Sequence, residues 1–500
     1  MTSKIFSAAY VGFDGKLIEV ECDTSNGLPG IVIVGLANKA VDEAKERIRS
    51  SVKNSGLSMP RKRITLNLAP ADLPKDGSSY DLPMAIAVLV SSEQVRSSEA
   101  QDSLFVGELS LDGKLRPIRG VISHAEVAKT QGFKRIFVPS KNAAEATLVE
   151  GIDIIAVHTL KEVVNHLNGT TIISPSIQGK TPQLNPAQSV DFSDIFGQQH
   201  AKRALEIAAA GHHNILMNGS PGAGKTMMAR ALLSVMPPAT REEIIAITKL
   251  HSLAGELSDE VYANRPFRSP HHTASSIALV GGGKNPRPGE ISLAHKGILF
   301  LDELPEYPRS CLESLRQPLE DRHITVARAQ ETVHFPADFM LVATQNPCPC
   351  GYYLDPDREC SCTPHQINQY SKKISGPLLD RIDLIVHVQK VAHKHLLSEA
   401  ASGSSSKDIA QRVLKAREKQ TKRFGKSGKT NAHMTNSDIK KVSGLQPEAK
   451  DFLENAARKL SLSARSYIKV IRVARTIADL ENDEEITTSH ISEALQYRQR

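Results

Sequence analysis

The stretch that decides the fold reads Gly219-Ser220-Pro221-Gly222-Ala223-Gly224-Lys225-Thr226. An apolar run over residues 214–218 leads into it, and a helical pattern over residues 227–235 follows it. In this strand–loop–helix context, glycines let backbone N–H groups turn toward phosphate oxygens, and the start of the helix adds a favourable dipole. We therefore expect these eight residues to hold ATP, with Lys225 at the β- and γ-phosphates and Thr226 as a ligand of Mg²⁺.

Two later apolar runs end in polar residues that suit the same chemistry. Residues 298–301 lead into Asp302 and Glu303. Asp302 stands where a second Mg²⁺-coordinating group belongs, and Glu303 is suited to polarise the attacking water. Residues 339–344 lead toward Asn346, which we expect between the two acids and the γ-phosphate. The alternatives are an ordinary surface acid pair and a strand-end cap.

The pattern of elements predicts an α/β protein of several domains. Continuous apolar strands alternate with helical patterns over residues 191–390, which favours a parallel sheet covered on both faces. Residues 1–168 mix short strands and helices, and residues 169–190 have the Ser, Thr, Pro and Gln composition of a linker. Residues 391–500 are expected to form a basic linker, with Lys and Arg gathered between 407 and 429, followed by a helical bundle.

Four of the six cysteines gather in residues 348–362. They are Cys348, Cys350, Cys360 and Cys362, arranged as two Cys-x-Cys pairs. Four thiolates can satisfy tetrahedral Zn²⁺, and a loop rich in Pro and Gly with no apolar core of its own gains from a metal. Reduced thiols without metal and an iron–sulfur cluster remain the alternatives. A catalytic role is not expected, because four protein ligands leave no open position.

Composition sets limits on the remaining function classes. The chain of 500 residues carries 62 Lys and Arg against 55 Asp and Glu, a net charge of +7 that does not by itself distinguish a nucleic-acid-binding protein from an ordinary basic one. Trp is absent and aromatic residues are scarce, which argues against base-stacking platforms. No signal peptide and no run of about 18 apolar residues is present, so we expect a cytoplasmic protein without a membrane span.

Taken together, the motifs resemble those of the AAA+ ATPases, and within them the magnesium-chelatase-like YifB/ComM family. The resemblance covers essentially the whole chain, with further stretches at residues 211–214, 268–273, 375–381 and 463–467. It implies a C-terminal helical lid and a ring of identical subunits, a hexamer, with ATP between neighbours. By motif, Arg381 would be the arginine finger that reaches the neighbour's γ-phosphate. Arg465 would be the sensor arginine that contacts nucleotide from the lid. The alternatives are a surface Asp380–Arg381 pair and a solvated helical arginine.

Two stretches beside the acidic strand resemble insertions of this branch of the family. Residues 274–284 are expected to form a loop with an apolar tip, and residues 321–336 a hairpin. In related ring helicases such loops line the pore, so Lys284, Arg322 and Arg328 are candidates for contacts to DNA phosphates. Solvent-facing loop charges are an equal alternative.

The N-terminal domain resembles the protease domain of Lon. Residues 74–79 and 107–118 carry this likeness, and Ser79 falls at the position of the nucleophilic serine. Lon-type proteases activate the serine with a lysine, whose position falls on Ile122 here. Isoleucine cannot take a proton, so we expect a non-catalytic domain. Lys114 is the alternative base.

Three functions follow from these resemblances. The first is an ATP-driven motor that binds single-stranded or branched DNA and drives branch migration in recombination or natural transformation. The second is a chelatase-type ATPase that remodels a protein partner. We expect it less, because chelatase motor subunits are expected to lack the Lon-like domain and the cysteine loop. The third is an ATP-dependent protease of the Lon type, which Ile122 disfavours.

Overall fold

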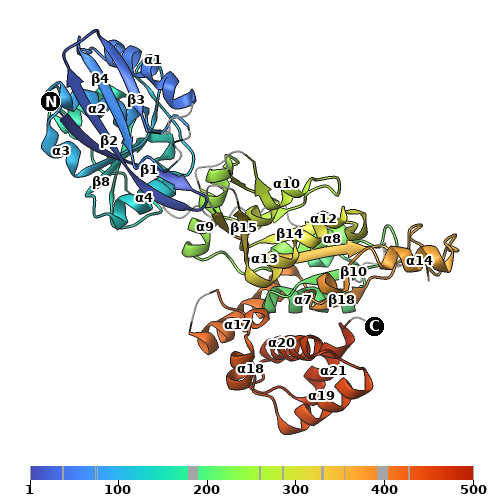
Figure 1. Cartoon of the computed structure of the whole chain (residues 1–500). Helices are drawn as coiled ribbons and strands as arrows, with labels where there is room; N and C mark the ends of the chain where they lie inside the picture. The colour runs from blue at the N-terminus through green and yellow to red at the C-terminus, as the bar shows by residue number, and fades with distance from the viewer. Residues whose placement is uncertain are drawn as a thin grey trace.

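The computed structural model describes the chain except for twelve short stretches or single residues. These are 1, 36–38, 74, 76, 178–189, 258–260, 284–285, 328–331, 354, 391–403, 426–427 and 499–500. Figure 1 shows an N-terminal sheet with its helices, a central sheet with helices on both sides, and a group of helices near the C-terminus. The α/β fold class predicted from the sequence is confirmed.

The N-terminal part is built on a mixed sheet of seven strands. The long β1 and β2 pair antiparallel, and the order across the sheet is β3-β4-β2-β1-β5-β8-β9. Helix α2 is apolar on every side and every residue in it is buried, so it forms the centre of this domain against β1 and β2. The strands of this part are β1 Thr2–Val11, β2 Asp14–Ser25, β3 Gly30–Val34, β4 Arg63–Ala69, β5 Ser103–Phe105, β6 Glu108–Leu109, β7 Leu115–Arg116, β8 Arg135–Pro139 and β9 Asp153–Val157. Strands β6 and β7 pair with each other and form a separate small sheet. The α-helices are α1 Lys39–Asn54, α2 Asp81–Ser91, α3 Ser97–Gln101, α4 Val121–Thr130, α5 Ala143–Ala146 and α6 Leu160–Leu167.

The central part is a parallel five-stranded sheet in the order β11-β14-β17-β10-β18. The strands are β10 Ile215–Asn218, β11 Phe267–Arg268, β14 Ile298–Leu301, β17 Met340–Gln345 and β18 Leu384–His387. All four residues of β14 are buried, as a strand covered on both faces requires. The helices are α7 Gln199–Gly211, α8 Lys225–Val235, α9 Arg241–Ala254, α10 Ser276–Val280, α11 Glu290–Leu293, α12 Arg309–Ser314, α13 Arg316–Asp321, α14 Pro364–Ser371 and α15 Gly376–Leu379.

Two short hairpins extend from this sheet. β12 Gly281–Gly282 pairs with β13 Arg287–Pro288, and β15 His323–Ala327 pairs antiparallel with β16 Thr332–Pro336. The hairpin predicted over residues 321–336 is therefore confirmed on its described residues. Before the first hairpin lies helix α10 rather than a simple loop, and its Ile277 is 64% exposed.

The C-terminal part is helical. Its helices are α17 Ser406–Phe424, α18 Asn436–Val442, α19 Pro447–Lys459, α20 Ala464–Glu481 and α21 Thr488–Gln496. The prediction of a basic linker is wrong over α17, which packs on α7, α8 and α20. Its cations have internal partners: Arg417 donates to the Ala209 carbonyl at 2.9 Å, and Arg423 pairs with the buried Asp479.

The N-terminal and central parts meet at α9 and at the β15–β16 hairpin. The Lys249 ammonium, on α9, lies 2.5 Å from Glu126 of α4 and 4.1 Å from the ring centroid of Phe13. The Ser252 hydroxyl accepts from the Gly120 N–H at 2.8 Å. A Cβ on Gly12, where φ is 63°, would lie 2.1 Å from Val333 of the hairpin. This joint therefore combines an ion pair, a buried hydrogen bond and close apolar packing.

None of the helices in the described ranges is both long and apolar enough to cross a membrane.

Candidate ATP site

The glycine-rich loop, residues 219–226, leaves the carboxyl end of the central strand β10 and enters α8. The Gly219 N–H donates to the Gln345 carbonyl at 3.2 Å, which ties the loop to the end of β17. A Cβ at Gly219 would lie 2.3 Å from the Val388 carbonyl oxygen, so only glycine fits there. Gly222 and Gly224 have φ of 78° and 84°, and each faces open space. The loop is therefore a concave cradle of backbone N–H groups at the start of a helix, which is the form of a phosphate site.

Lys225 is folded into this cradle. Its ammonium donates to the carbonyls of Gly219 at 2.5 Å and Ser220 at 3.1 Å, and to Asn346 Oδ1 at 3.1 Å. Burial lowers the pKa of Lys225, while the nearby charges of Asp302 and Glu303 raise it. The structure thus brings Asn346, predicted from a distant strand end, into direct contact with the lysine.

Asp302 and Thr226 meet on the other side of the loop. The Thr226 hydroxyl donates to Asp302 Oδ2 at 3.2 Å. This pairing is possible because β14 and β10 flank β17 in a parallel sheet, so their carboxyl ends lie at one edge. A hydroxyl and a carboxylate at this spacing are the oxygen ligands that Mg²⁺ prefers.

Thr344 is a site residue that the sequence analysis missed. Its hydroxyl, on the fully buried end of β17, donates to Asp302 Oδ1 at 2.5 Å and accepts from the Glu303 N–H at 3.0 Å. One side chain therefore positions both acids. Its signal was weak, because a threonine inside an apolar run resembles any β-branched strand residue.

Glu303 has a backbone conformation that few side chains adopt. Its φ and ψ are both 52°, in the left-handed region, at a cost of about 1–3 kcal/mol. Beside it opens a hollow of about 1080 Å³, lined also by Asn346, Tyr370 and Lys373. At Glu303, whose carboxylate would orient water, the chain thus turns away from the direction of β14.

Arg381 and Arg465 lie away from this cradle. The backbone carbonyl of Arg381 accepts from the Asn214 side chain at 2.9 Å, and Asn214 directly precedes β10. The glycine-rich loop leaves the other end of β10, about 13 Å away along four residues of strand. Both guanidinium groups bind Glu320, Arg465 at 2.9 Å. The two arginines therefore share one position at the amino-terminal edge of the sheet, on the opposite side from Lys225.

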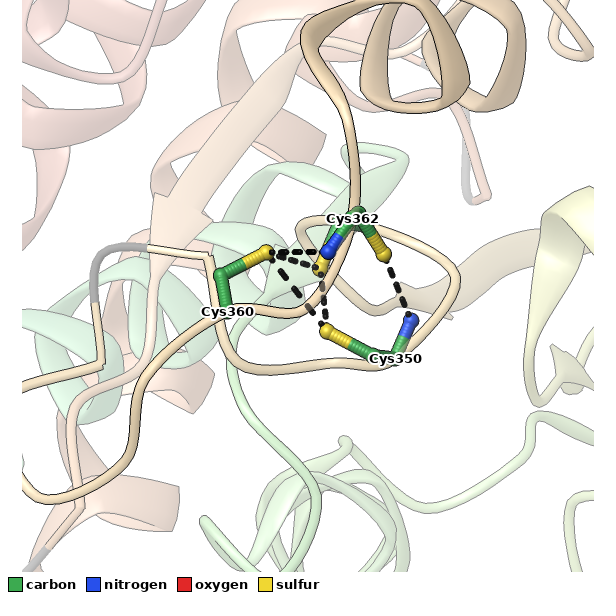
Figure 2. Close-up of side chains that lie close together, drawn as sticks. Cys350, Cys360 and Cys362 are labelled. Carbon is green, nitrogen blue, oxygen red and sulfur yellow. Dashed lines mark hydrogen bonds between the residues drawn. The ribbon is translucent and has the colours of Figure 1, made fainter.

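The four cysteines lie together as the spacing predicted, and Figure 2 labels three of them, Cys350, Cys360 and Cys362. The Cys348 sulfur is 3.3 Å from that of Cys350 and 3.7 Å from that of Cys360, and Cys350 is 3.5 Å from Cys360. All four sulfurs lie within 4.8 Å of one another, and all are free thiols. The cluster can hold a metal ion such as zinc.

Of the three cations predicted to contact DNA, the structure describes one, Arg322. Lys284 and Arg328 lie outside the described residues. Arg322 ends α13, and its guanidinium lies 3.8 Å from the carboxylate of Asp338. An arginine held beside an internal acid does not present itself as a loop-tip cation, so the expectation of a phosphate contact at Arg322 is not supported.

In the Lon-like part, the groups available near the expected dyad do not suit proteolysis. Ile122 is fully buried in an apolar cluster with Val121, Ala125 and Ile136. The side chain of Lys114 is 71% exposed and pairs with Asp112 at 3.0 Å. Ile122 cannot take a proton, and Lys114 is held at the surface by its ion pair with Asp112.

Known proteins resemble this chain over its whole length. The "Competence protein ComM" of Haemophilus influenzae is 44% identical over 498 residues, covering 99% of this chain and 97% of that protein. The "Uncharacterized protein YifB" of Escherichia coli is 42% identical over 497 residues, covering 99% and 97%. A "Lon protease" of Lachnoclostridium phytofermentans is 27% identical over 172 residues, 32% of this chain and 21% of that protein.

Three family descriptions also match, all of them of a chelatase subunit. Residues 191–396 match "Magnesium chelatase, subunit ChlI", residues 20–142 match "Subunit ChlI of Mg-chelatase", and residues 403–498 match "Magnesium chelatase, subunit ChlI C-terminal". The second match removes the architectural argument against the chelatase-type function, because the N-terminal part also falls under a chelatase description. By these family matches and by identity along nearly the whole of both relatives, this chain belongs to the ComM/YifB family of magnesium-chelatase-like AAA+ ATPases.

Proposed function

We propose that this chain is the subunit of a ring-shaped motor, a homohexamer, that hydrolyses ATP to move single-stranded or branched DNA. In this proposal it drives branch migration in recombination or natural transformation. The observation that carries the ring is the separation of Arg381 from Lys225 by the length of β10. An arginine side chain is too short to span that distance, so in this proposal Arg381 serves the nucleotide of another subunit.

The described residues fit ATP and Mg²⁺. Gly222 and Gly224 have left-handed backbones that face open space, and Lys225 is already turned into the cradle. Thr226 and Asp302 would hold Mg²⁺, which neutralises charge on the phosphates when bound. Lys225 and Asn346 would fix the γ-phosphate.

The chain's own residues would then divide the work of hydrolysis. The Glu303 carboxylate orients a water for in-line attack, and Thr344 holds that glutamate in its left-handed turn. The neighbouring subunit's Arg381, released from Glu320, stabilises charge that develops on the transferring phosphoryl group. Arg465 shares Glu320, so in this proposal both arginines enter the same neighbouring site.

DNA as the substrate has separate support. A relative that is 44% identical across nearly its whole length is named as a competence protein. Helix α10, whose Ile277 is 64% exposed, is an element that a motor could move against a polymer.

The direct test measures ATP hydrolysis with no nucleic acid, with single-stranded DNA and with a four-way junction, together with strand displacement on a forked duplex. The proposal expects several-fold stimulation by DNA and displacement that requires ATP. Glu303→Gln serves as the control that should bind ATP and displace nothing. Hydrolysis that ignores DNA, with no strand displacement by the wild type, would sink the DNA part of the proposal.

A chelatase-type remodelling ATPase is the second candidate. The observation that favours it is the set of three family matches, each described as the ChlI subunit of magnesium chelatase. It predicts hydrolysis that DNA leaves unchanged and that a protein partner stimulates. Proteolysis is not proposed, because Ile122 and Lys114 provide no base for Ser79.

A further inference from the structure

We infer that the four cysteines bind one Zn²⁺, and that this zinc-bound loop, residues 348–362, braces the phosphate-binding loop so that tight ATP binding depends on zinc. The inference rests on the proposed ATP site. It goes beyond that site in assigning the metal a role in shaping the nucleotide cradle.

The sulfur geometry fits a tetrahedral metal. Zinc–sulfur bonds of about 2.3 Å in a tetrahedron place the sulfurs about 3.8 Å apart. The distances between the sulfurs of Cys348, Cys350 and Cys360 are 3.3, 3.5 and 3.7 Å. These are far longer than a disulfide bond of about 2.05 Å. Four sulfurs thus converge on one point without bonding to each other.

Backbone donors already face the sulfurs. The Cys350 N–H donates to Cys362 Sγ and the Cys362 N–H donates to Cys360 Sγ, both at 3.4 Å, as Figure 2 shows. The Tyr353 N–H donates to Cys348 Sγ at 3.3 Å. Such N–H groups stabilise negative charge on sulfur, and they are the outer contacts expected around metal-bound thiolates.

The cysteine loop, residues 348–362, buries few of its side chains. Cys348 and Gly351 are buried, but the described residues from 352 to 363 are half-buried or exposed. A stretch that buries so few side chains gains most of its order from a metal.

The cysteine loop packs against the phosphate-binding loop, residues 219–226. A Cβ on Gly351, where φ is 85°, would lie 2.7 Å from Pro221 and 4.0 Å from Asn346. Asp355 lies 2.8 Å from the Lys390 ammonium, and Lys390 and then Ser220 lower the pKa of its carboxyl. Asn346 itself stands only two residues before Cys348. The cysteine loop therefore lies against the phosphate-binding loop at Pro221 and holds the chain that directly follows Asn346.

The first test is metal content. The full-length wild type, purified without added metal or chelator, is expected to carry about one zinc per chain by elemental analysis. The double variant Cys350→Ser/Cys360→Ser should lose it. Cys22→Ser removes a buried thiol from the N-terminal domain and should retain it. Less than about half a zinc per wild-type chain, or iron with inorganic sulfide in its place, would overturn the assignment.

The second test separates metal binding from bracing, using a fluorescent ATP analogue in the absence of DNA. Cys350→Ser/Cys360→Ser, and wild type stripped with a zinc chelator, should bind the analogue at least about tenfold more weakly, and zinc should restore the stripped protein. Gly351→Ala keeps all four cysteines and should keep its zinc, yet bind ATP more weakly, because its Cβ displaces Pro221.

Two outcomes would overturn the inference that the zinc-bound loop supports ATP binding. One is unchanged ATP affinity in the stripped wild type, and the other is unchanged affinity in Gly351→Ala with zinc bound. If the double variant does not fold, removing zinc from the folded wild type with a chelator still tests the inference. A wild type that carries zinc but binds no ATP would instead overturn the proposed ATPase, so the two failures are distinguishable.

Discussion

Replacing Thr344 by valine should slow ATP hydrolysis while leaving ATP binding largely intact. Valine has nearly the shape of threonine, so the buried end of β17 keeps its packing. What is lost is the hydroxyl that donates to Asp302 and accepts from the Glu303 N–H. Both acids then lose the group that positions them.

The size of the effect follows from those two hydrogen bonds. A bond to a charged carboxylate contributes about 1.5–3 kcal/mol and a neutral bond about 1 kcal/mol. If the loss of about 2–4 kcal/mol falls on the transition state, kcat should drop roughly 30- to 1000-fold. The Glu303 N–H would also be left unpaired in its left-handed turn, which should make the glutamate mobile.

The assay is steady-state ATP hydrolysis beside equilibrium binding of a fluorescent ATP analogue, with thermal melting to confirm the fold. Thr344→Ser is the matched control, because it retains the hydroxyl, and it should keep within about threefold of the wild-type rate. Wild-type hydrolysis by Thr344→Val would refute the reasoning, as would equal losses in Val and Ser variants.

Other variants test single steps of the same site. Glu303→Gln should bind ATP with wild-type affinity and hydrolyse it at least about 100-fold more slowly, which a normal rate would contradict. Lys225→Ala should lose ATP binding in a titration while its melting curve in the absence of nucleotide stays close to wild type. Gly219→Ala should lower the melting temperature, because its Cβ would lie 2.3 Å from the Val388 carbonyl; an unchanged melting temperature would show that the loop can shift.

Much of the ATP site could be predicted because it is assembled at strand ends. Parallel strands bring their carboxyl ends to one edge, so a polar residue after an apolar run marks the site whatever the distance along the chain. Asp302 and Asn346 follow this rule, and they lie beside Thr226 and Lys225 of the glycine-rich loop. Thr344 does not follow this rule. It lies inside strand β17, where a threonine cannot be told from other β-branched strand residues by the sequence pattern.

Charge was a poorer guide than strand order. Arg417 and Arg423 lie in the stretch predicted to be a basic linker, yet Arg417 donates to the Ala209 carbonyl and Arg423 pairs with Asp479. Lys and Arg at helical spacing look alike whether they face solvent or cap another helix. The common partner of Arg381 and Arg465 was also hidden, since Glu320 lies 61 and 145 positions from them in sequence.

The central claim is that each ATP site is shared between two subunits, and mixing two inactive variants tests it most directly. Lys225→Ala lacks the nucleotide cradle but keeps Arg381, whereas Arg381→Ala has the opposite defect. Each alone should be nearly inactive. Rings assembled from an equal mixture should regain about a quarter of wild-type hydrolysis, since one interface in four joins an intact cradle to an intact arginine. No recovery in mixed rings, or an active Arg381→Ala homo-oligomer, would contradict the account.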